Sequence, residues 1–456
     1  MTTNSNSPTV ELDASPAEKP VSLRQKVVQG TKWNLFGQAF GQGWRLAANL
    51  IVAQLVAPDA FGIMLMINVF VFSVQMLSDV GLRDAVIHND HGDEPRFLNT
   101  VWTIQIIRGF ALWGIICIGT VPFANFYGVR ELYFLLPVAG LTAAIRGLCS
   151  TSLLTAGRHI HPAWTVTTEI VSSVSSSLVT IAVAVMTHNV WALVIGQVMG
   201  AVFFSAVSYR FGHHRNHRFQ WDREAARAVS SFGRWVIPSS TLTILLRRGD
   251  SIVLGKVMDT TTLGVYSIGA NLALMWVTVY GQMASSILHP VYSKTRKLPI
   301  QEARTKIRKL RFAICGACLA GIWAMIGLSY WFFALLYKPE FLNAYIFCQV
   351  VAFGITLRVT TDMGPVFQAH GMARRHFILV CIRSAGTVLA MFLGYVLAGF
   401  IELPHAYYGV LWGAALSPLI FYPIQCYMYR QIDMWFPEID AMGVIPAVGL
   451  VIYGLF

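Results

Sequence analysis

Long apolar runs separated by short polar segments dominate the chain from about residue 33 onward. Each run covers roughly 20 residues or more, the length that an α-helix needs to cross a hydrocarbon core of about 30 Å. The pattern therefore predicts an all-α polytopic membrane protein with about twelve spans. The predicted spans are 33–57, 61–87, 97–121, 132–154, 163–186, 191–209, 231–257, 263–292, 312–336, 343–368, 376–400 and 404–428.

Polar segments divide these spans into two sets of six. A cytoplasmic lead is expected at 1–32, where the first twenty residues are rich in Ser, Thr, Pro and Glu. A basic cytoplasmic linker is expected at 210–230, and a C-terminal tail at 429–456. The apolar stretch 443–456 is short for a span, which leaves open a partial thirteenth helix and an interfacial segment.

Composition excludes an ordinary soluble domain, because only 12% of the residues are charged, whereas a soluble domain has about 25%. With the N-terminus inside, the cytoplasmic segments collect 22 of the 34 Lys and Arg residues, and the outer loops collect two, Arg130 and Lys338. This asymmetry predicts a cytoplasmic N-terminus. The net charge of +12 then faces anionic headgroups. Because the basic residues are scattered among several loops, they do not favour a nucleic-acid partner.

The two sets of spans share a weak internal repeat. A shift of 202 positions aligns the start of the second half with that of the first. The matched residues are Lys32-Trp33 with Arg234-Trp235, Arg45 with Arg247, and Gly62 with Gly264. Since both halves begin inside, the repeat predicts two parallel six-helix bundles, 33–209 and 231–428, related by a pseudo-two-fold axis along the membrane normal. Transporters built in this way bind substrate between the halves.

Ten cations lie within predicted spans, where a charge costs several kcal/mol unless it faces protein or water. They are Arg45, Arg83, Arg108, Arg146, Arg234, Arg247, Arg248, Lys256, Arg358 and Arg383. The acids in or at the edge of the spans are Asp79, Asp84, Glu169, Asp250 and Asp362. At least five cations therefore remain uncompensated. The balance predicts a positive cavity for an anionic substrate, and the arginine fork suits phosphate.

Arg234 and Lys256 lie near span ends, and the other eight cations fall into two groups. Three have an acid three or four positions away in the pairs Asp79–Arg83, Arg247–Asp250 and Arg358–Asp362. These are interpreted either as structural ion pairs or as groups that take part in ion coupling. Those without a well-placed acid are Arg45, Arg108, Arg146, Arg383 and Arg248. They are candidates to bind the anion or to pair with an acid on another helix. Glu169 could carry a coupling proton or pair with such an arginine.

Several features argue against an enzyme. The outer loops are short, whereas a membrane glycan polymerase or ligase needs a catalytic outer loop, and no nucleotide-binding motif is present. The histidines at 213, 214 and 217 stand beside Arg215 and Arg218, which would repel a metal cation. Neither a metal nor a cofactor is expected. The spans 191–209, 263–292, 312–336 and 404–428 contain no Lys, Arg, Asp or Glu, which predicts that they face lipid.

The segment from residue 30 to 87 resembles the polysaccharide-transport branch of the MOP flippase superfamily, the Wzx-like oligosaccharide flippases. The resemblance is carried by the turn AQLVAPDAFG, residues 53–62, and by the D-x-G-x-x-x-A-x-I segment from Asp79 to Ile87. The segments LLTAGRHIHPAW, VFQAHGMARRHF and LLYKPEFLNA are also similar to the family. Arg83 departs from it, because the family often has a second small residue there.

The resemblance implies two six-helix bundles around a V-shaped cavity that alternates its access. It also implies a substrate, undecaprenyl-pyrophosphate-linked oligosaccharide, that crosses the bacterial inner membrane for exopolysaccharide, capsule or O-antigen biosynthesis. The arginines without a nearby acid would then bind the pyrophosphate, and polysaccharide polymerase and export machinery would be partners. Three alternatives remain open: a multidrug or cation exporter of the same superfamily, a membrane glycan polymerase or ligase, and a scaffold for a synthesis complex.

Overall fold

The computed structural model describes residues 23–77, 82, 86, 92–158, 162–210, 217–223, 248–295, 299–362, 364–369, 372–400 and 405–452. Within these ranges every regular element is a helix, which confirms the all-α prediction. The predicted intramembrane residues Asp79, Arg83, Arg234 and Arg247 lie outside the described residues.

The helices of the first half are α1 (Leu23–Leu55), α2 (Pro58–Leu77), α4 (Pro95–Tyr127), α5 (Leu132–Gly147), α6 (Ser152–Arg158), α7 (Pro162–Thr187) and α8 (Trp191–Ser208). Those of the second half are α10 (Thr260–Met283), α11 (His289–Thr295), α12 (Ile300–Leu336), α13 (Ala344–Thr361), α14 (Gly364–Ala369), α15 (Ala373–Phe400), α16 (Ala406–Ile420), α17 (Tyr422–Arg430) and α18 (Pro437–Ile452). A π-helical turn, Ala284–Leu288, joins α10 to α11, and a short 3₁₀ turn, Pro339–Phe341, precedes α13. Residues 248–257 are also helical.

By length and composition, nine helices among the described residues can cross a membrane, and α5 is a shorter apolar helix. The protein is thus a multi-pass membrane protein. Several boundaries differ from the prediction. The span expected at 132–154 ends at Gly147 and is followed by α6, and the span expected at 343–368 is interrupted at Asp362. The helix expected from 312 begins at Ile300, because its polar first turns are also helix formers.

Helix ends follow local sequence rules. Pro95 occupies the first turn of α4, where no N–H is needed. Gly128 ends the same helix with φ 73°, and its N–H bonds to the carbonyl of Ala124. At the start of α10, the Asp259 carboxylate accepts a hydrogen bond from the Thr262 N–H at 3.0 Å. These ends fix the short turns that join neighbouring helices.

Small residues let neighbouring helices approach closely. On α7, the Ser172 and Ser176 hydroxyls donate to the carbonyls of Gly200 and Gly196 on α8, at 2.7 and 2.8 Å. Such hydrogen bonds and glycine contacts stabilise helix pairs where no hydrophobic driving force acts between helices.

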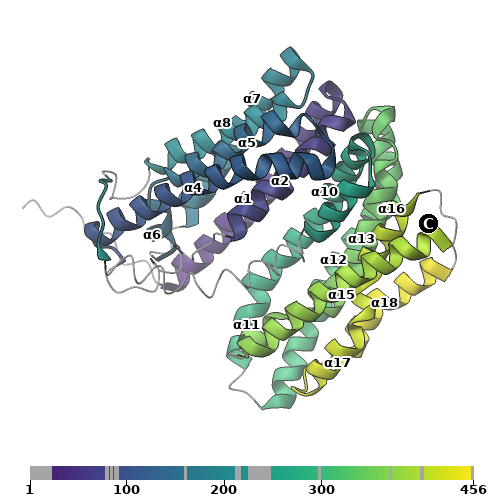
Figure 1. Ribbon diagram of the computed structural model, residues 1–456. Coiled ribbons are helices and arrows are strands. Elements are labelled where there is room, and N and C mark those ends of the chain that lie inside the picture. Colours follow the sequence, from purple (N-terminus) through teal and green to yellow (C-terminus); the bar gives the residue numbers. More distant parts are fainter. Residues whose placement is uncertain are drawn as a thin grey trace, which may run out of the picture.

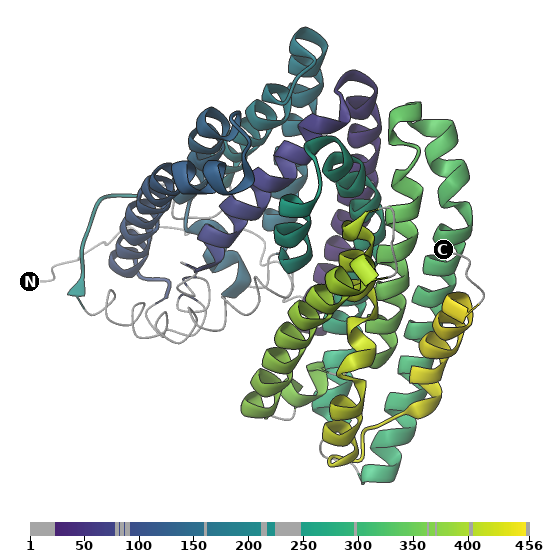
Figure 2. The ribbon, with the colours of Figure 1, turned by 45° about the vertical axis from the view of Figure 1, so that its right-hand side comes forward.

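The two halves form two groups of helices that meet at one end and separate toward the other (Figures 1 and 2). We call the meeting end the closed end. Here α2 and α10 cross at Gly62 and Gly264. A Cβ atom on Gly264 would lie 1.7 Å from the Pro58 carbonyl oxygen, and one on Gly62 would lie 2.0 Å from that of Thr260. Only glycine permits this backbone approach.

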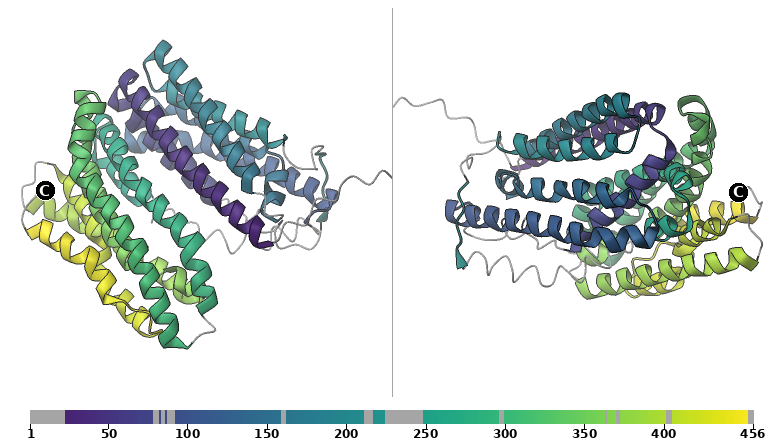
Figure 3. Two further views of the ribbon diagram at one scale, coloured as in Figure 1. Left: turned by 180° about the vertical axis from the view of Figure 1, so that it is seen from behind. Right: turned by 45° about the horizontal axis from the view of Figure 1, so that its top comes forward.

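Residues 443–452 of the C-terminal apolar stretch belong to a helix, α18, at the edge of the second half (Figure 3). It packs against α13, where a Cβ atom on Gly443 would lie 2.3 Å from the Thr360 hydroxyl oxygen. The helix spans 16 residues, Pro437–Ile452. The described part of the tail is thus integrated into the second half.

Residues 217–222 lie along the start of α4 and are held there by its side chains. The backbone N–H groups of Arg218, Gln220 and Asp222 donate to the side chains of Asn99, Thr103 and Thr100, at 3.2, 3.1 and 3.1 Å. His217 forms a 3.0 Å hydrogen bond with the Ser150 hydroxyl and stacks on Trp102. His213 and His214 lie outside the described residues. This part of the linker is therefore fixed to the first half.

Candidate functional site

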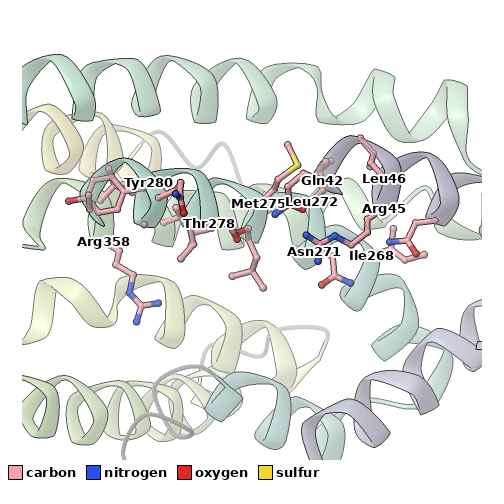
Figure 4. A pocket seen from close by; sticks show the side chains of 18 of the residues that line it. Gln42, Arg45, Leu46, Ile268, Asn271, Leu272, Met275, Thr278, Tyr280 and Arg358 are labelled. Carbon is pink, nitrogen blue, oxygen red and sulfur yellow. The ribbon is translucent and has the colours of Figure 1, made fainter. Parts of the chain in front are cut away.

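A cavity of about 1150 Å³ lies between the two halves. Its walls come from α1 and α2 of the first half and from α10, α13 and the π-helical turn of the second. Figure 4 shows Arg45 and Asn271, from α1 and α10, directed toward one region, while Arg358 extends from α13 at the other end. The prediction that 263–292 faces lipid is therefore wrong, because α10 forms a wall of this cavity. Its polar side chains, such as Asn271, are uncharged and gave no charge signal.

Three arginines line this cavity, namely Arg45, Arg248 and Arg358, with Asp362 as the acid among its lining residues. The Arg45 side chain is exposed, and its Nε donates to the Gly41 carbonyl of its own helix at 3.1 Å. Within the described residues, neither Arg45 nor Arg248 forms an ion pair. Their charges are therefore available to a ligand in the cavity.

Two smaller cavities continue from the first. One, of about 410 Å³, shares Arg248 and Asn49 with the large cavity and adds Arg146. The other, of about 370 Å³, shares Arg146 with it and adds Arg108. Together the described linings hold five arginines against one acid, so they carry a strongly positive potential.

Aromatic rings position two of these arginines. The guanidinium carbon of Arg146 lies 5.3 Å from the centre of the Phe204 ring, and that of Arg248 lies 5.3 Å from the centre of the Phe72 ring. Such cation–π contacts are favourable but do not neutralise the charge. The N–H groups of both side chains therefore remain able to bind an anion.

Arg383 belongs to a different environment. Its Nη1 lies 2.9 Å from Asp362 Oδ1, and both side chains are mostly shielded from solvent. With its carboxamide oxygen turned toward Arg383, Gln425 accepts from Nε at 2.8 Å and from Nη2 at 3.2 Å. Of the two interpretations for Arg383, pairing with an acid on another helix is therefore the one that the geometry favours.

The Arg383–Asp362 ion pair also corrects the expected pairing of Asp362 with Arg358. Its carboxylate forms the ion pair with Arg383 on α15 rather than with Arg358, one turn earlier on α13, and it also accepts from the Gly364 N–H at 2.8 Å. The helix ends at Asp362, so the carboxylate no longer follows the i,i+4 geometry of a continuous helix. Arg358 remains close enough for a favourable electrostatic interaction with Asp362.

The other acids have separate surroundings. Asp250 accepts hydrogen bonds from the Tyr266 hydroxyl at 2.7 Å and from the Ser251 hydroxyl at 3.4 Å. Its expected partner Arg247 lies outside the described residues. Glu169 is exposed on α7 and is not among the lining residues of the three cavities.

Gln105 and Arg311 have structural roles that the sequence alone could not assign. Gln105 donates to the carbonyls of Arg146, Gly147 and Cys149 at 3.1–3.3 Å, and so it satisfies the end of α5. Arg311 precedes the span expected at 312–336, yet it belongs to α12 and its side chain is fully buried. Its Nη2 donates to the Thr360 carbonyl at 2.7 Å, while Nε and Nη1 have no hydrogen-bond partner in the described part of the chain.

The fold of this protein is similar to that of two solved membrane proteins. The fold is similar to that of the lipid II flippase MurJ in an inward closed conformation, with a TM-score of 0.66, 13% identity and 93% of each chain covered. It is also similar to an inward-facing multidrug resistance MATE family transporter, with a TM-score of 0.61, 15% identity, and 86% of this chain and 94% of the other covered. The comparison therefore shows that the chain has the fold of these two membrane proteins.

The chain belongs to the polysaccharide biosynthesis protein family, whose model matches residues 51–315. It is 19% identical to the lipopolysaccharide biosynthesis protein WzxC of Escherichia coli, over 95% of this chain and 90% of WzxC. It is 25% identical to the teichuronic acid biosynthesis protein TuaB of Bacillus subtilis, over 66% of this chain and 62% of TuaB. The match therefore spans less than two thirds of TuaB.

Proposed function

We propose that this protein is a flippase that moves undecaprenyl-pyrophosphate-linked oligosaccharide across the bacterial inner membrane by alternating access. The main observation in support of this proposal is that five arginines and one acid line the three connected cavities. A pyrophosphate crossing the membrane needs its negative charge matched, and arginine forks bind phosphate oxygens in a bidentate way. The apolar remainder of the lining lets the lipid tail stay in the bilayer.

Orientation and architecture complete the proposal. The twelve-span arrangement in two six-helix bundles, with the N-terminus in the cytoplasm, makes the closed end extracytoplasmic. The cavity then opens toward the cytoplasm, where the lipid-linked glycan would enter. After the halves rock, the substrate would leave toward the outer leaflet and pass to the polysaccharide polymerase and export machinery.

A multidrug or cation exporter is the second candidate, because the fold is also that of a MATE transporter. A cationic drug would be repelled by Arg45, Arg146 and Arg248 in the cavities. The charge of the cavities therefore favours the anionic lipid over a cationic drug.

Reconstituted proteoliposomes test the proposal. The wild-type protein should carry a fluorescent undecaprenyl-pyrophosphate-linked oligosaccharide between leaflets, measured by accessibility to a membrane-impermeant quencher. The double variant Arg45→Ala, Arg146→Ala should lose at least about tenfold in rate, since each charged hydrogen bond contributes roughly 1.5–3 kcal/mol. Arg375→Ala, which removes an exposed arginine next to Met372, is the matched control. Wild-type transport by the double variant would contradict the proposal.

A further inference from the structure

The cavity of about 410 Å³ is lined by five carboxamide side chains, and we call it the carboxamide chamber. They are Asn49, Asn68, Gln75, Gln197 and Asn271. They come from four helices of both halves, α1, α2, α8 and α10. Its volume falls in the range of small-molecule sites, about 300–1,000 Å³.

These carboxamides are largely unused by the protein. The side chains of Asn49, Gln75 and Asn271 form no hydrogen bond to the described part of the chain. Gln197 Nε2 donates to Asn68 Oδ1 at 3.1 Å, but Gln197 Oε1 is buried without a partner. Buried polar atoms in folded proteins nearly always have a partner. The buried Gln197 oxygen and the carboxamides of the lining are therefore suited to bind a polar ligand.

The chemistry of the lining narrows the ligand. Carboxamides offer donors and acceptors together, as hydroxyl groups do. Phe61 and Phe72 add apolar ring faces, and Arg146 and Arg248 stand in the lining, which holds no acid among its described residues. A pyrophosphate alone would bind to the arginines and would not use the carboxamides. A neutral group with many hydroxyls, next to a pyrophosphate, would use both sets.

We propose that the carboxamide chamber binds the sugar residue next to the pyrophosphate, so that it recognises the glycan while the arginines recognise the charge. This inference rests on the proposed function and deepens it. The shared residues Asn49, Asn271 and Arg248 join the chamber to the large cavity, so one ligand can occupy both.

Two ligands distinguish binding at the arginines from binding in the carboxamide chamber. One is geranylgeranyl pyrophosphate, and the other is the same lipid pyrophosphate linked to a single glucose. Binding to the full-length protein in nanodiscs is measured for each. Asn49→Leu, Gln75→Leu and Asn271→Leu keep side-chain volume but remove the amide. Each should weaken binding of the glucose-linked probe about three- to tenfold, and change binding of the bare pyrophosphate less than about twofold.

The control is Gln42→Leu, a carboxamide that lines the large cavity but not the chamber. It should affect the two probes equally. Equal losses for both probes in the chamber variants, or no loss for either, would overturn the chamber. Failure of the wild type to bind either probe would overturn the proposed function and the chamber with it. Thermal unfolding of every variant checks that a loss of binding is not a loss of folding.

A second, independent observation concerns the closed end. Gln54 Nε2, on α1, donates to the carbonyl of Leu336 at the end of α12, at 2.9 Å. Lys256 Nζ, in the second half, donates to the carbonyl of Phe126 at the end of α4, at 2.5 Å. The last carbonyls of a helix have no partner within the helix, so both contacts satisfy a helix end of the opposite half.

The two contacts are pseudo-symmetric. The shift of 202 positions that aligns Gly62 with Gly264 also aligns Gln54 with Lys256. The ends of α4 and α12 share the pattern F-A-x-x-Y, residues 123–127 and 333–337, which aligns Phe126 with Leu336. In each half, the same position of the first expected span therefore caps the same position at the end of the other half's third expected span.

From this symmetry we infer that the two caps form a latch that holds the closed end shut, with its two sides unequal in strength. The Lys256 ammonium acts on the negative end of the α4 dipole and lies 4.9 Å from the centre of the Phe126 ring. Gln54 provides a neutral hydrogen bond. Opening must break both contacts, and the lysine side resists more.

Spin labels at Ala57→Cys and Glu340→Cys, with Cys117, Cys381 and Cys426 replaced by Ser, report the separation of the halves at the closed end. Lys256→Met should raise the population of long distances about tenfold or more, and Gln54→Leu about two- to tenfold. Arg130→Met, which removes an exposed cation nearby, should leave it unchanged. Unchanged distances in both latch variants would overturn the inference. No substrate is needed, so the result is independent of the proposed function.

Discussion

The cavities and the packed helices of the second half give arginine opposite surroundings. In the first half, Arg45 and Arg146 are exposed in cavities, and neither forms an ion pair within the described residues. In the second half, Arg383 is paired with Asp362, and Arg311 is fully enclosed. The second half holds both kinds of arginine, because Arg248 and Arg358 also line the cavities. The surroundings of an intramembrane arginine, not its presence, decide its role.

The largest effect should come from breaking the ion pair of the second half. Asp362→Asn leaves Arg383 shielded from solvent without its counter-charge, which costs about 3–5 kcal/mol. Thermal unfolding in detergent should show a clear fall in midpoint. An unchanged midpoint would place Arg383 with the exposed arginines and remove the contrast between the cavities and the packed helices.

The next largest effect should be a loss of ligand binding at unchanged stability. Arg45→Ala should leave the unfolding midpoint within about a degree, since exposed side chains contribute little to stability. It should weaken binding of geranylgeranyl pyrophosphate by roughly 1.5–3 kcal/mol, because a charged hydrogen bond is lost. Calorimetry and thermal unfolding on the same sample measure both. A fall in midpoint with intact binding would reverse the roles assigned to cavity-lining and enclosed arginines.

Arg311 sharpens the comparison further. Arg311→Met removes a buried charge with two unsatisfied nitrogen atoms and keeps an unbranched apolar stem. Such a replacement should be neutral or stabilising by roughly 1–2 kcal/mol. If the unfolding midpoint instead falls steeply, the enclosed arginine contributes a charge interaction that the second half needs.

The smallest effect is expected at the surface of the second half. Arg308 and Glu438 form a 2.7 Å ion pair in which both side chains are more than half exposed. Arg308→Ala should change stability by about 1 kcal/mol or less. Chemical denaturation at low and high salt gives the value, and a larger change would show that α18 depends on this contact.

Charge and hydropathy patterns identified the main features of the fold and cavity. The apolar runs predicted the helices, and the excess of arginine over acid predicted the positive lining. Arg45, Arg108, Arg146 and Arg248 do line the three cavities. Positions without a charge, such as Asn271 and Gln197, gave no signal, because an amide in an apolar run has no distinctive spacing.

Tertiary contacts explain the remaining differences. The pairing of Asp362 with Arg383 joins residues 21 positions apart on two helices, which no helical register can reveal. Arg311 appeared to belong to a polar loop because four cations precede it within seven positions, at 304, 306, 308 and 309. Its burial depends on how α12 packs against α13 and α18, information that local sequence does not contain.

The attachment of residues 217–222 to α4 has a consequence for how the halves stay together. Because three backbone N–H groups are held by α4 side chains, this stretch moves with the first half and adds nothing to the free length of the connection. A shorter tether raises the effective concentration of one half near the other. If the halves rock as proposed, this attachment keeps them within reach of each other, and reclosure is an intramolecular encounter.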